Sequence, residues 1–92
     1  MTLEELYKII EDRKKTMPKD SYVASLIASG NDRVIQKVGE EATEVVIAAK
    51  NEEKERIVAE VADLLFHTLI LLANNDIKPD EVLEELERRN KK

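Results

Sequence analysis

Acidic side chains occur at helical spacing in two apolar stretches of this 92-residue chain. In the segment GEEATEVVIAAKN, Glu41 and Glu44 are three residues apart and follow Glu40. In the second stretch, Glu60 and Asp63 have the same spacing. Residues three apart are neighbours on one face of an α-helix, so each stretch presents a pair of carboxylates. Charged groups at a packed surface are costly unless a positive group meets them.

The register of the two stretches predicts that the pairs meet. In an antiparallel hairpin with its turn centred on residue 52, Glu41 faces Asp63 and Glu44 faces Glu60. Residue 52 lies in the polar run KNEEKE, which reads as a turn. Four carboxylates at one level repel each other and take up protons unless a cation joins them. Oxygen-only ligands favour Mg²⁺ or Mn²⁺, and Mg²⁺ held by protein carboxylates commonly takes phosphate oxygens as well. The pattern therefore points to phosphate chemistry.

Two other interpretations of the acids stay open. A salt-bridged hairpin would neutralise them with basic residues nearby: Arg33, Lys37, Lys50 or Arg56. That explains the pair at the edge of the first helix, but it explains Glu60 and Asp63 poorly, because buried ion pairs seldom add net stability. A di-iron bundle would need Glu-x-x-His pairs, whereas the single histidine, His67, lies four residues after Asp63. We interpret His67 as a core residue or a support for a metal ligand.

Helices must position these residues, because the chain is rich in Ala, Leu, Glu and Lys and has only two glycines and two prolines. The first helix should begin at Thr2, where Thr2 and Glu5 have capping-box spacing, and end before Pro18. The segment SYVASLIAS that follows fits either a short helix or an ordered loop. Asn31 or Asp32 is the predicted N-cap of the next helix.

That second long helix should run from Arg33 to about Lys50, with Val34, Val38, Ala42, Val45 and Ala49 as its apolar stripe. A third runs to about Asn74 and is apolar nearly all round, which predicts a central, buried element. Its polar residues Glu60, Asp63 and His67 fall within a stripe about 60° wide. Pro79 suits the first turn of a last helix that reaches about Arg89. The prediction is an all-α bundle of four to five helices in a single domain, residues 1–92.

Composition excludes several classes of protein. The net charge is −5, which argues against a general nucleic-acid binder. The N-terminus lacks the apolar core of a signal peptide, and the longest apolar run, Leu69 to Ala73, is too short to span a bilayer. We expect a cytoplasmic protein that binds neither nucleic acid nor membrane. Because a chain this short buries a modest core and has no cysteine, a second subunit is expected, with Val46 and Ile47 as extra surface for it. Gly39, inside a helix, suggests close approach by another backbone or a ligand.

The motifs also carry a family resemblance. E-E-x-x-E followed by E-x-x-D resembles the all-α nucleotide pyrophosphohydrolases, the MazG-like superfamily. SY-x-x-x-L, G-x-x-R-x-x-x-K-x-GEE, AAK and DLLFH resemble, more narrowly, the phosphoribosyl-ATP pyrophosphatases of histidine biosynthesis, in their stand-alone form. This resemblance covers most of the chain. It implies Mg²⁺-dependent hydrolysis of 1-(5-phosphoribosyl)-ATP to 1-(5-phosphoribosyl)-AMP and pyrophosphate by a homodimer.

By resemblance, the metal positions are Glu41, Glu44, Glu60 and Asp63. Glu40 is the extra acid of the motif, and either Glu40 or Glu41 is the expected catalytic base. Candidate substrate-binding residues flank the acids: Ser21, Tyr22, Arg33, Lys37, Lys50 and Asn51. Ordinary surface cations, an N-cap at Ser21 and a packing aromatic at Tyr22 are the simpler interpretations of these residues.

Two further functions stay open at this point. A pyrophosphohydrolase that removes non-canonical nucleoside triphosphates would share the acids but not the SYVASL and AAKN sequences. A non-catalytic helical interaction module would carry the acids only as solvated or salt-bridged groups.

Overall fold

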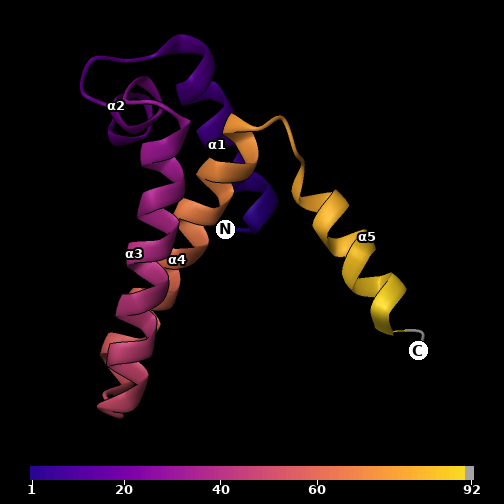
Figure 1. The fold of residues 1–92 in the computed structure, drawn as a ribbon. Helices are drawn as coiled ribbons and strands as arrows, with labels where there is room; N and C mark the ends of the chain where they lie inside the picture. The colour runs from indigo at the N-terminus through magenta and orange to yellow at the C-terminus, as the bar shows by residue number, and fades with distance from the viewer. Residues whose placement is uncertain (91–92) are drawn as a thin grey trace.

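Five α-helices make up the chain in a computed structural model that describes residues 1–90, and no strand occurs within that range. The helices are α1 (Leu3–Thr16), α2 (Tyr22–Ala28), α3 (Asn31–Lys50), α4 (Lys54–Asn74) and α5 (Pro79–Asn90). Figure 1 shows α3 and α4 as a long antiparallel pair, with α1 and α2 gathered at one end and α5 projecting away. The all-α prediction is confirmed.

The first helix begins as its sequence predicts. The Thr2 hydroxyl accepts a hydrogen bond from the Glu5 backbone N–H, and the Glu5 carboxylate accepts one from the Thr2 N–H, which completes a capping box. The helix ends at Thr16, and its C-cap, Met17, has a left-handed conformation (φ 49°) just before Pro18.

The segment of ambiguous structure forms the short helix α2, with Ser21 as its N-cap. The predicted N-cap of α3, Asn31 or Asp32, is wrong by one or two residues, because Gly30 (φ 104°) takes that position and the helix starts at Asn31. The Asn31 side-chain oxygen instead accepts hydrogen bonds from the amides of Asn74 and Asn75, at 3.0 and 3.1 Å. These bonds tie the start of α3 to the end of α4.

The α3–α4 hairpin turns at the residue that its register requires. Residues 51–53 form the connection, and Glu52 at its centre has a left-handed conformation (φ 57°). The α3–α4 packing is more extensive than that of any other helix pair. The turn therefore places the two acidic stretches at matching heights.

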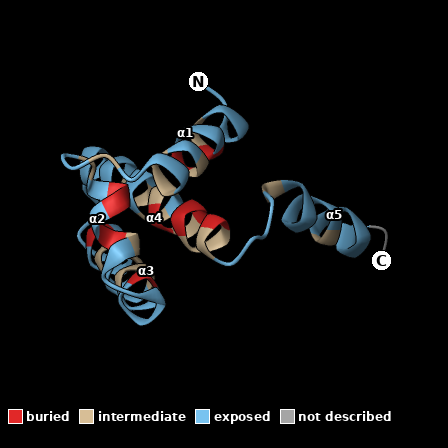
Figure 2. Cartoon of the chain, turned by 90° about the horizontal axis from the view of Figure 1, so that it is seen from above, coloured by how far each residue is buried: buried red, intermediate tan, exposed pale blue. Residues whose placement is uncertain are grey.

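The core lies at the end of the hairpin where α1 and α2 pack against it (Figure 2). It is built from the following buried residues: Tyr7, Ile10, Val23, Leu26, Val34, Leu69, Ile70 and Ala73. On α3 the buried stripe includes Ala48, whereas Ala49 is exposed, contrary to prediction.

The prediction that the third long helix is buried throughout is only half right. The buried residues of α4 all lie between His67 and Ala73, whereas Val58 in its N-terminal half is 63% exposed and Leu65, just past its middle, is 44% exposed. The hairpin extends beyond α1 and α2 (Figure 1), so the chain itself leaves this half uncovered. By length and composition alone, α4 would also permit a membrane span, yet Glu60 and Asp63 lie near its middle, where a charge in lipid is expensive.

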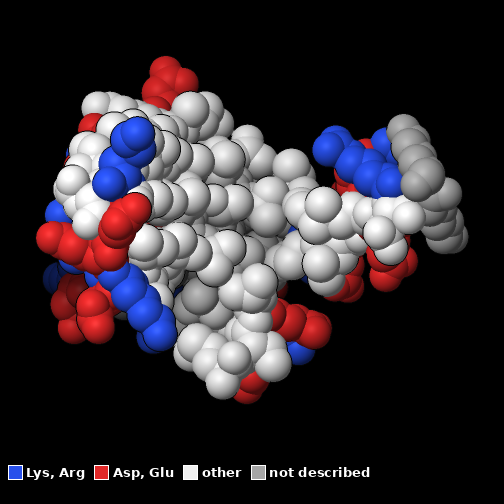
Figure 3. Space-filling model, turned by 90° about the horizontal axis from the view of Figure 1, so that it is seen from below, with Lys and Arg blue, Asp and Glu red and all other residues white. Residues whose placement is uncertain are grey.

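The charged side chains are unevenly distributed over the surface. Seen from below, acidic and basic residues crowd the end of the α3–α4 hairpin, and uncharged residues cover much of the area between it and α5 (Figure 3). α5 contains no buried residue, and its apolar side chains Val82, Leu83 and Leu86 are 43%, 55% and 54% exposed.

Candidate functional site

Three carboxylates converge between the two long helices. Glu41 of α3 and Glu60 and Asp63 of α4 each offer one oxygen, and these oxygens lie within 4.8 Å of one another. Glu41 and Glu60 are half-buried, while Asp63 is exposed. The hairpin turn at residue 52 creates this arrangement, because it sets Glu41 opposite Asp63. We call these three residues the acid cluster.

The acid cluster differs from the neighbouring acids in its lack of cationic partners. No Lys or Arg nitrogen within residues 1–90 lies within 4.0 Å of its carboxylates. Glu44, predicted to join the cluster, instead lies 3.7 Å from an Arg56 guanidinium nitrogen. Glu40 lies 3.5 Å from Arg33 and 3.6 Å from Lys37. The salt-bridged interpretation therefore describes Glu40 and Glu44 but not the acid cluster.

The dimensions of the acid cluster suit a small divalent cation. Oxygens on opposite sides of a Mg²⁺ ion lie about 4.2 Å apart, because each Mg–O distance is about 2.1 Å. Neighbouring oxygens on an octahedral ion lie closer, about 3.0 Å apart, so the three oxygens, which lie within 4.8 Å of one another, need to approach each other by less than about 2 Å. The like charges of Glu41 and Glu60 repel each other, and partial burial without a cationic partner strengthens this repulsion. A bound cation would relieve it.

Of the basic residues predicted to bind substrate, the structure brings two close to the acids. Arg33 and Lys37 precede Glu40 on α3 and contact its carboxylate, and the Lys37 side chain is only 21% exposed. Lys50 lies about 13 Å farther along the helix axis than Glu41, at the opposite end of α3 from α2. Asn51 there is the C-cap of α3. The structure does not bring Lys50 and Asn51 together with Ser21 and Tyr22.

Tyr22 of α2 approaches the side of α4 that carries Asp63 and His67. Its hydroxyl oxygen lies 2.7 Å from His67 Nε2, and His67 Nδ1 lies 2.7 Å from the backbone carbonyl oxygen of Asp63. The Tyr22 ring also stacks on Phe66, with 6.3 Å between ring centroids. Ser21 acts as an N-cap, because its hydroxyl accepts a hydrogen bond from the Ala24 N–H. The spacing of the acidic stripe placed His67 in line with Asp63, but it gave no signal for the contact with Tyr22.

Gly39 does not show the close approach expected for it within this chain. A Cβ at Gly39 would meet no atom within 4 Å. Any neighbour that requires glycine there must come from outside the residues 1–90 of one chain.

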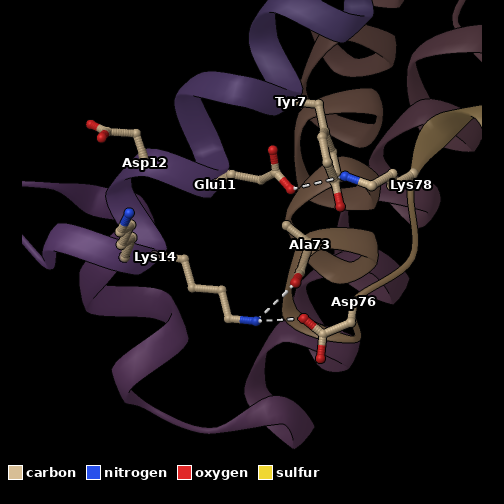
Figure 4. Close-up of a pocket in the computed structure, with 8 residues that line it drawn as sticks. Tyr7, Glu11, Asp12, Lys14, Ala73, Asp76 and Lys78 are labelled. Carbon is tan, nitrogen blue, oxygen red and sulfur yellow. Dashed lines mark hydrogen bonds and ion pairs between the residues drawn. The ribbon is translucent and has the colours of Figure 1, made fainter.

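A large cavity lies away from the acid cluster. It has a volume of about 560 Å³ and opens between α1 and the α4–α5 connection (Figure 4). Several of its charged groups already have partners: Lys14 Nζ donates to the Ala73 carbonyl oxygen at 3.0 Å and lies 3.3 Å from Asp76, and Lys78 lies 3.7 Å from Glu11. These contacts join α1 to the connection, so we interpret the cavity as part of the packing of α1.

One wall of this cavity is a tyrosine with a perturbed pKa. The Tyr7 hydroxyl donates a hydrogen bond to the Ile77 carbonyl oxygen at 2.6 Å. Burial raises the pKa of Tyr7 above its ordinary value of 10.0, and the nearby carboxylates of Glu11, Asp76 and Glu81 raise it further. Tyr7 therefore stays neutral and holds the α4–α5 connection against α1.

Comparison with known proteins gives a consistent result. The sequence profile of the phosphoribosyl-ATP pyrophosphohydrolase family matches residues 3–90. A phosphoribosyl-ATP pyrophosphatase of Geobacter sulfurreducens is 55% identical over 87 residues, which cover 95% of this chain and 81% of the relative. One from Sulfolobus acidocaldarius is 50% identical over 90 residues (98% and 95% of the two chains), and one from Metallosphaera sedula is 54% identical over 89 residues (97% and 96%).

Proposed function

The chain belongs to the phosphoribosyl-ATP pyrophosphohydrolase family, and on that premise we propose its reaction and its site. It hydrolyses 1-(5-phosphoribosyl)-ATP to 1-(5-phosphoribosyl)-AMP and pyrophosphate, the second step of L-histidine biosynthesis. The observation that carries the assignment of the site is the acid cluster, whose three oxygens lie within 4.8 Å of one another without a cationic partner among the described residues.

The acid cluster holds the metal ion in this proposal. Glu41, Glu60 and Asp63 bind Mg²⁺, or Mn²⁺ in its place, since both prefer oxygen ligands. A bound ion would supply the neutralisation of charge on the substrate's phosphate oxygens that phosphoanhydride hydrolysis mainly requires. Glu44 is the fourth proposed ligand, because it lies one turn after Glu41. To bind the ion, its carboxylate would have to leave the Arg56 guanidinium.

The basic residues of α3 bind the phosphate chain. Arg33 and Lys37 now contact Glu40, and phosphate oxygens would replace that carboxylate as their partner. Glu40 is then free to accept a proton from the attacking water. Glu41 is the other candidate for this catalytic base. Ser21 and Tyr22 line the other side of the nucleotide, and Lys50 and Asn51 lie too far along α3 to contact the same phosphates.

We also propose that the active protein is a homodimer. Apolar side chains of α4 and α5 are exposed, among them Val58 at 63% and Leu83 at 55%, and Figure 3 shows a broad uncharged area on one face of the molecule. On α3, Val46 and Ile47 are 60% and 42% exposed, as the predicted subunit contact requires. Stable interfaces bury about 800 Å² per partner, and exposed apolar side chains on α3, α4 and α5 would contribute to that area.

One assay tests the reaction. Release of pyrophosphate is measured from phosphoribosyl-ATP, ATP and non-canonical triphosphates such as dITP, each with and without Mg²⁺. We expect strong preference for phosphoribosyl-ATP and no turnover in excess EDTA. Equal rates on non-canonical triphosphates would point to the house-cleaning function, and the absence of all turnover would point to an interaction module.

A further inference from the structure

Two hydrogen bonds connect the Tyr22 hydroxyl to the backbone of Asp63 through the ring of His67. The backbone oxygen of Asp63 can only accept a hydrogen bond, so His67 Nδ1, 2.7 Å away, must carry a hydrogen. His67 is the buried polar side chain of the described core, at 5% exposure. Within residues 1–90 no carboxylate oxygen lies within 4.0 Å of either ring nitrogen, whose partners are the Tyr22 hydroxyl and the Asp63 carbonyl oxygen, and charge without a partner is costly to bury. The neutral ring satisfies both of its contacts.

A neutral imidazole with its hydrogen on Nδ1 has a lone pair on Nε2. The Tyr22 oxygen lies 2.7 Å from Nε2, so the phenol must donate its only hydrogen to His67. The Tyr22 oxygen then offers only its two lone pairs to other groups. It can accept a hydrogen bond from a ligand, but it cannot donate one.

This polarity decides which part of the substrate suits Tyr22. Phosphate oxygens are acceptors at neutral pH and would meet the lone pairs of Tyr22 unfavourably. Ribose hydroxyls and the exocyclic nitrogen of adenine are donors. Along α4, His67 lies one turn beyond Asp63 on the side of α2, and Phe66 stacks on the Tyr22 ring at the same level. A nucleotide with phosphates at the acid cluster would extend its nucleoside toward this aromatic surface.

We infer that His67 fixes Tyr22 as a hydrogen-bond acceptor, so that Tyr22 recognises a hydroxyl or amino group of the nucleoside and not the phosphates. Tyr22 is the specificity-determining residue, and His67 is a positioning residue that acts through it. The substrate side of this inference rests on the proposed function, whereas the tautomer of His67 does not.

The tautomer is measurable because the chain has one histidine. In the full-length protein labelled with ¹⁵N-histidine, two-dimensional NMR at pH 8 should show the hydrogen on Nδ1 and a lone pair on Nε2. The tautomer favoured by free histidine, with the hydrogen on Nε2, would overturn the inference, as would a ring protonated on both nitrogens.

Kinetics test the recognition. Tyr22→Phe keeps the ring but removes the acceptor, so KM for phosphoribosyl-ATP should rise about three- to tenfold, the loss expected for one hydrogen bond. The inhibition constant of inorganic pyrophosphate, which carries only phosphates, should stay unchanged. Parallel weakening of pyrophosphate would assign Tyr22 to the phosphates, and an unchanged KM would remove it from the site; both outcomes overturn the inference.

Tyr7→Phe is the matched control, because it also removes a phenol that donates a hydrogen bond, to the Ile77 carbonyl. It should lower Tm and leave both constants unchanged. If wild-type protein does not hydrolyse phosphoribosyl-ATP at all, the proposed function fails, while the NMR measurement still decides the tautomer by itself.

Discussion

Glu41 on α3 and Asp63 on α4 face each other across the hairpin, with one carboxylate oxygen of each within 4.8 Å of the other and of Glu60. These like charges have no cationic side chain among the described residues between them. Their proximity costs stability in the free protein, and the proposed metal ion converts that cost into affinity.

Asp63→Asn removes one charge of the acid cluster and keeps the size of the side chain. We expect kcat/KM to fall at least about a hundredfold, because the metal supplies several kcal/mol of charge stabilisation. In EDTA the variant should melt at the same temperature as wild type or higher, since repulsion is relieved. Adding Mg²⁺ should raise the Tm of wild type only. If Mg²⁺ leaves the Tm of the wild-type protein unchanged, that result would contradict the metal site.

Glu44 and Arg56 form an exposed ion pair, which allows a test with matched variants. Glu44→Gln and Arg56→Gln each remove the same pair, which stabilises the fold by about 1 kcal/mol at most. If Glu44 is a metal ligand in the working enzyme, only Glu44→Gln abolishes turnover, and Arg56→Gln keeps it. Equal, small effects of both variants on kcat/KM would assign Glu44 to the ion pair alone.

Local sequence patterns predicted the parts of the fold that depend on local physics. The capping box at Thr2 and the turn at residue 52 follow from interactions between near neighbours, and both were found. The position of the turn then fixed which acids could meet. Family motifs pointed to the same residues.

Contacts between distant or competing side chains could not be predicted in this way. Spacing placed Glu44 beside Glu41, but it does not reveal that the Arg56 guanidinium competes for its carboxylate. Periodicity showed that α4 is apolar all round, but not that α1 and α2 end halfway along it. The bond from Tyr22 to His67 joins segments 45 residues apart, and no local pattern encodes it.

Gly39 and Gly30 give a contrast in backbone physics. Gly39 is helical with open space where a Cβ would lie, so Gly39→Ala should stabilise the chain by about 1 kcal/mol, which raises Tm by about 4–8 °C. Gly30 has φ 104°, a conformation that strains other residues, so Gly30→Ala should lower Tm. If a ligand or second subunit approaches Gly39, the stabilised Gly39→Ala variant should also lose activity or dimer affinity. Unchanged activity would leave Gly39 a neutral glycine.

Tyr7 predicts a pH dependence of stability. Its pKa is raised in the folded chain above 10.0, so at alkaline pH the unfolded chain loses the phenolic proton first and binds fewer protons than the folded chain. The free energy of unfolding should therefore fall as pH rises through and above about 10. Urea titrations from pH 8 to pH 11 would measure this fall, and Tyr7→Phe should show less of it. An identical pH dependence in the two proteins would rule out Tyr7 as its source.

The apolar side of α5 predicts how the dimer can be broken. Leu83 is 55% exposed on a helix without buried residues, and in the proposed dimer its neighbour is the second subunit. Leu83→Lys places a charge in that contact and should convert the dimer to monomer at micromolar concentration in sedimentation equilibrium. Glu84→Lys changes the adjacent, exposed side chain by a larger charge and is the matched control, which should remain dimeric. Wild-type protein that sediments as a monomer would refute the dimer, and a dimeric Leu83→Lys variant would exclude α5 from its interface.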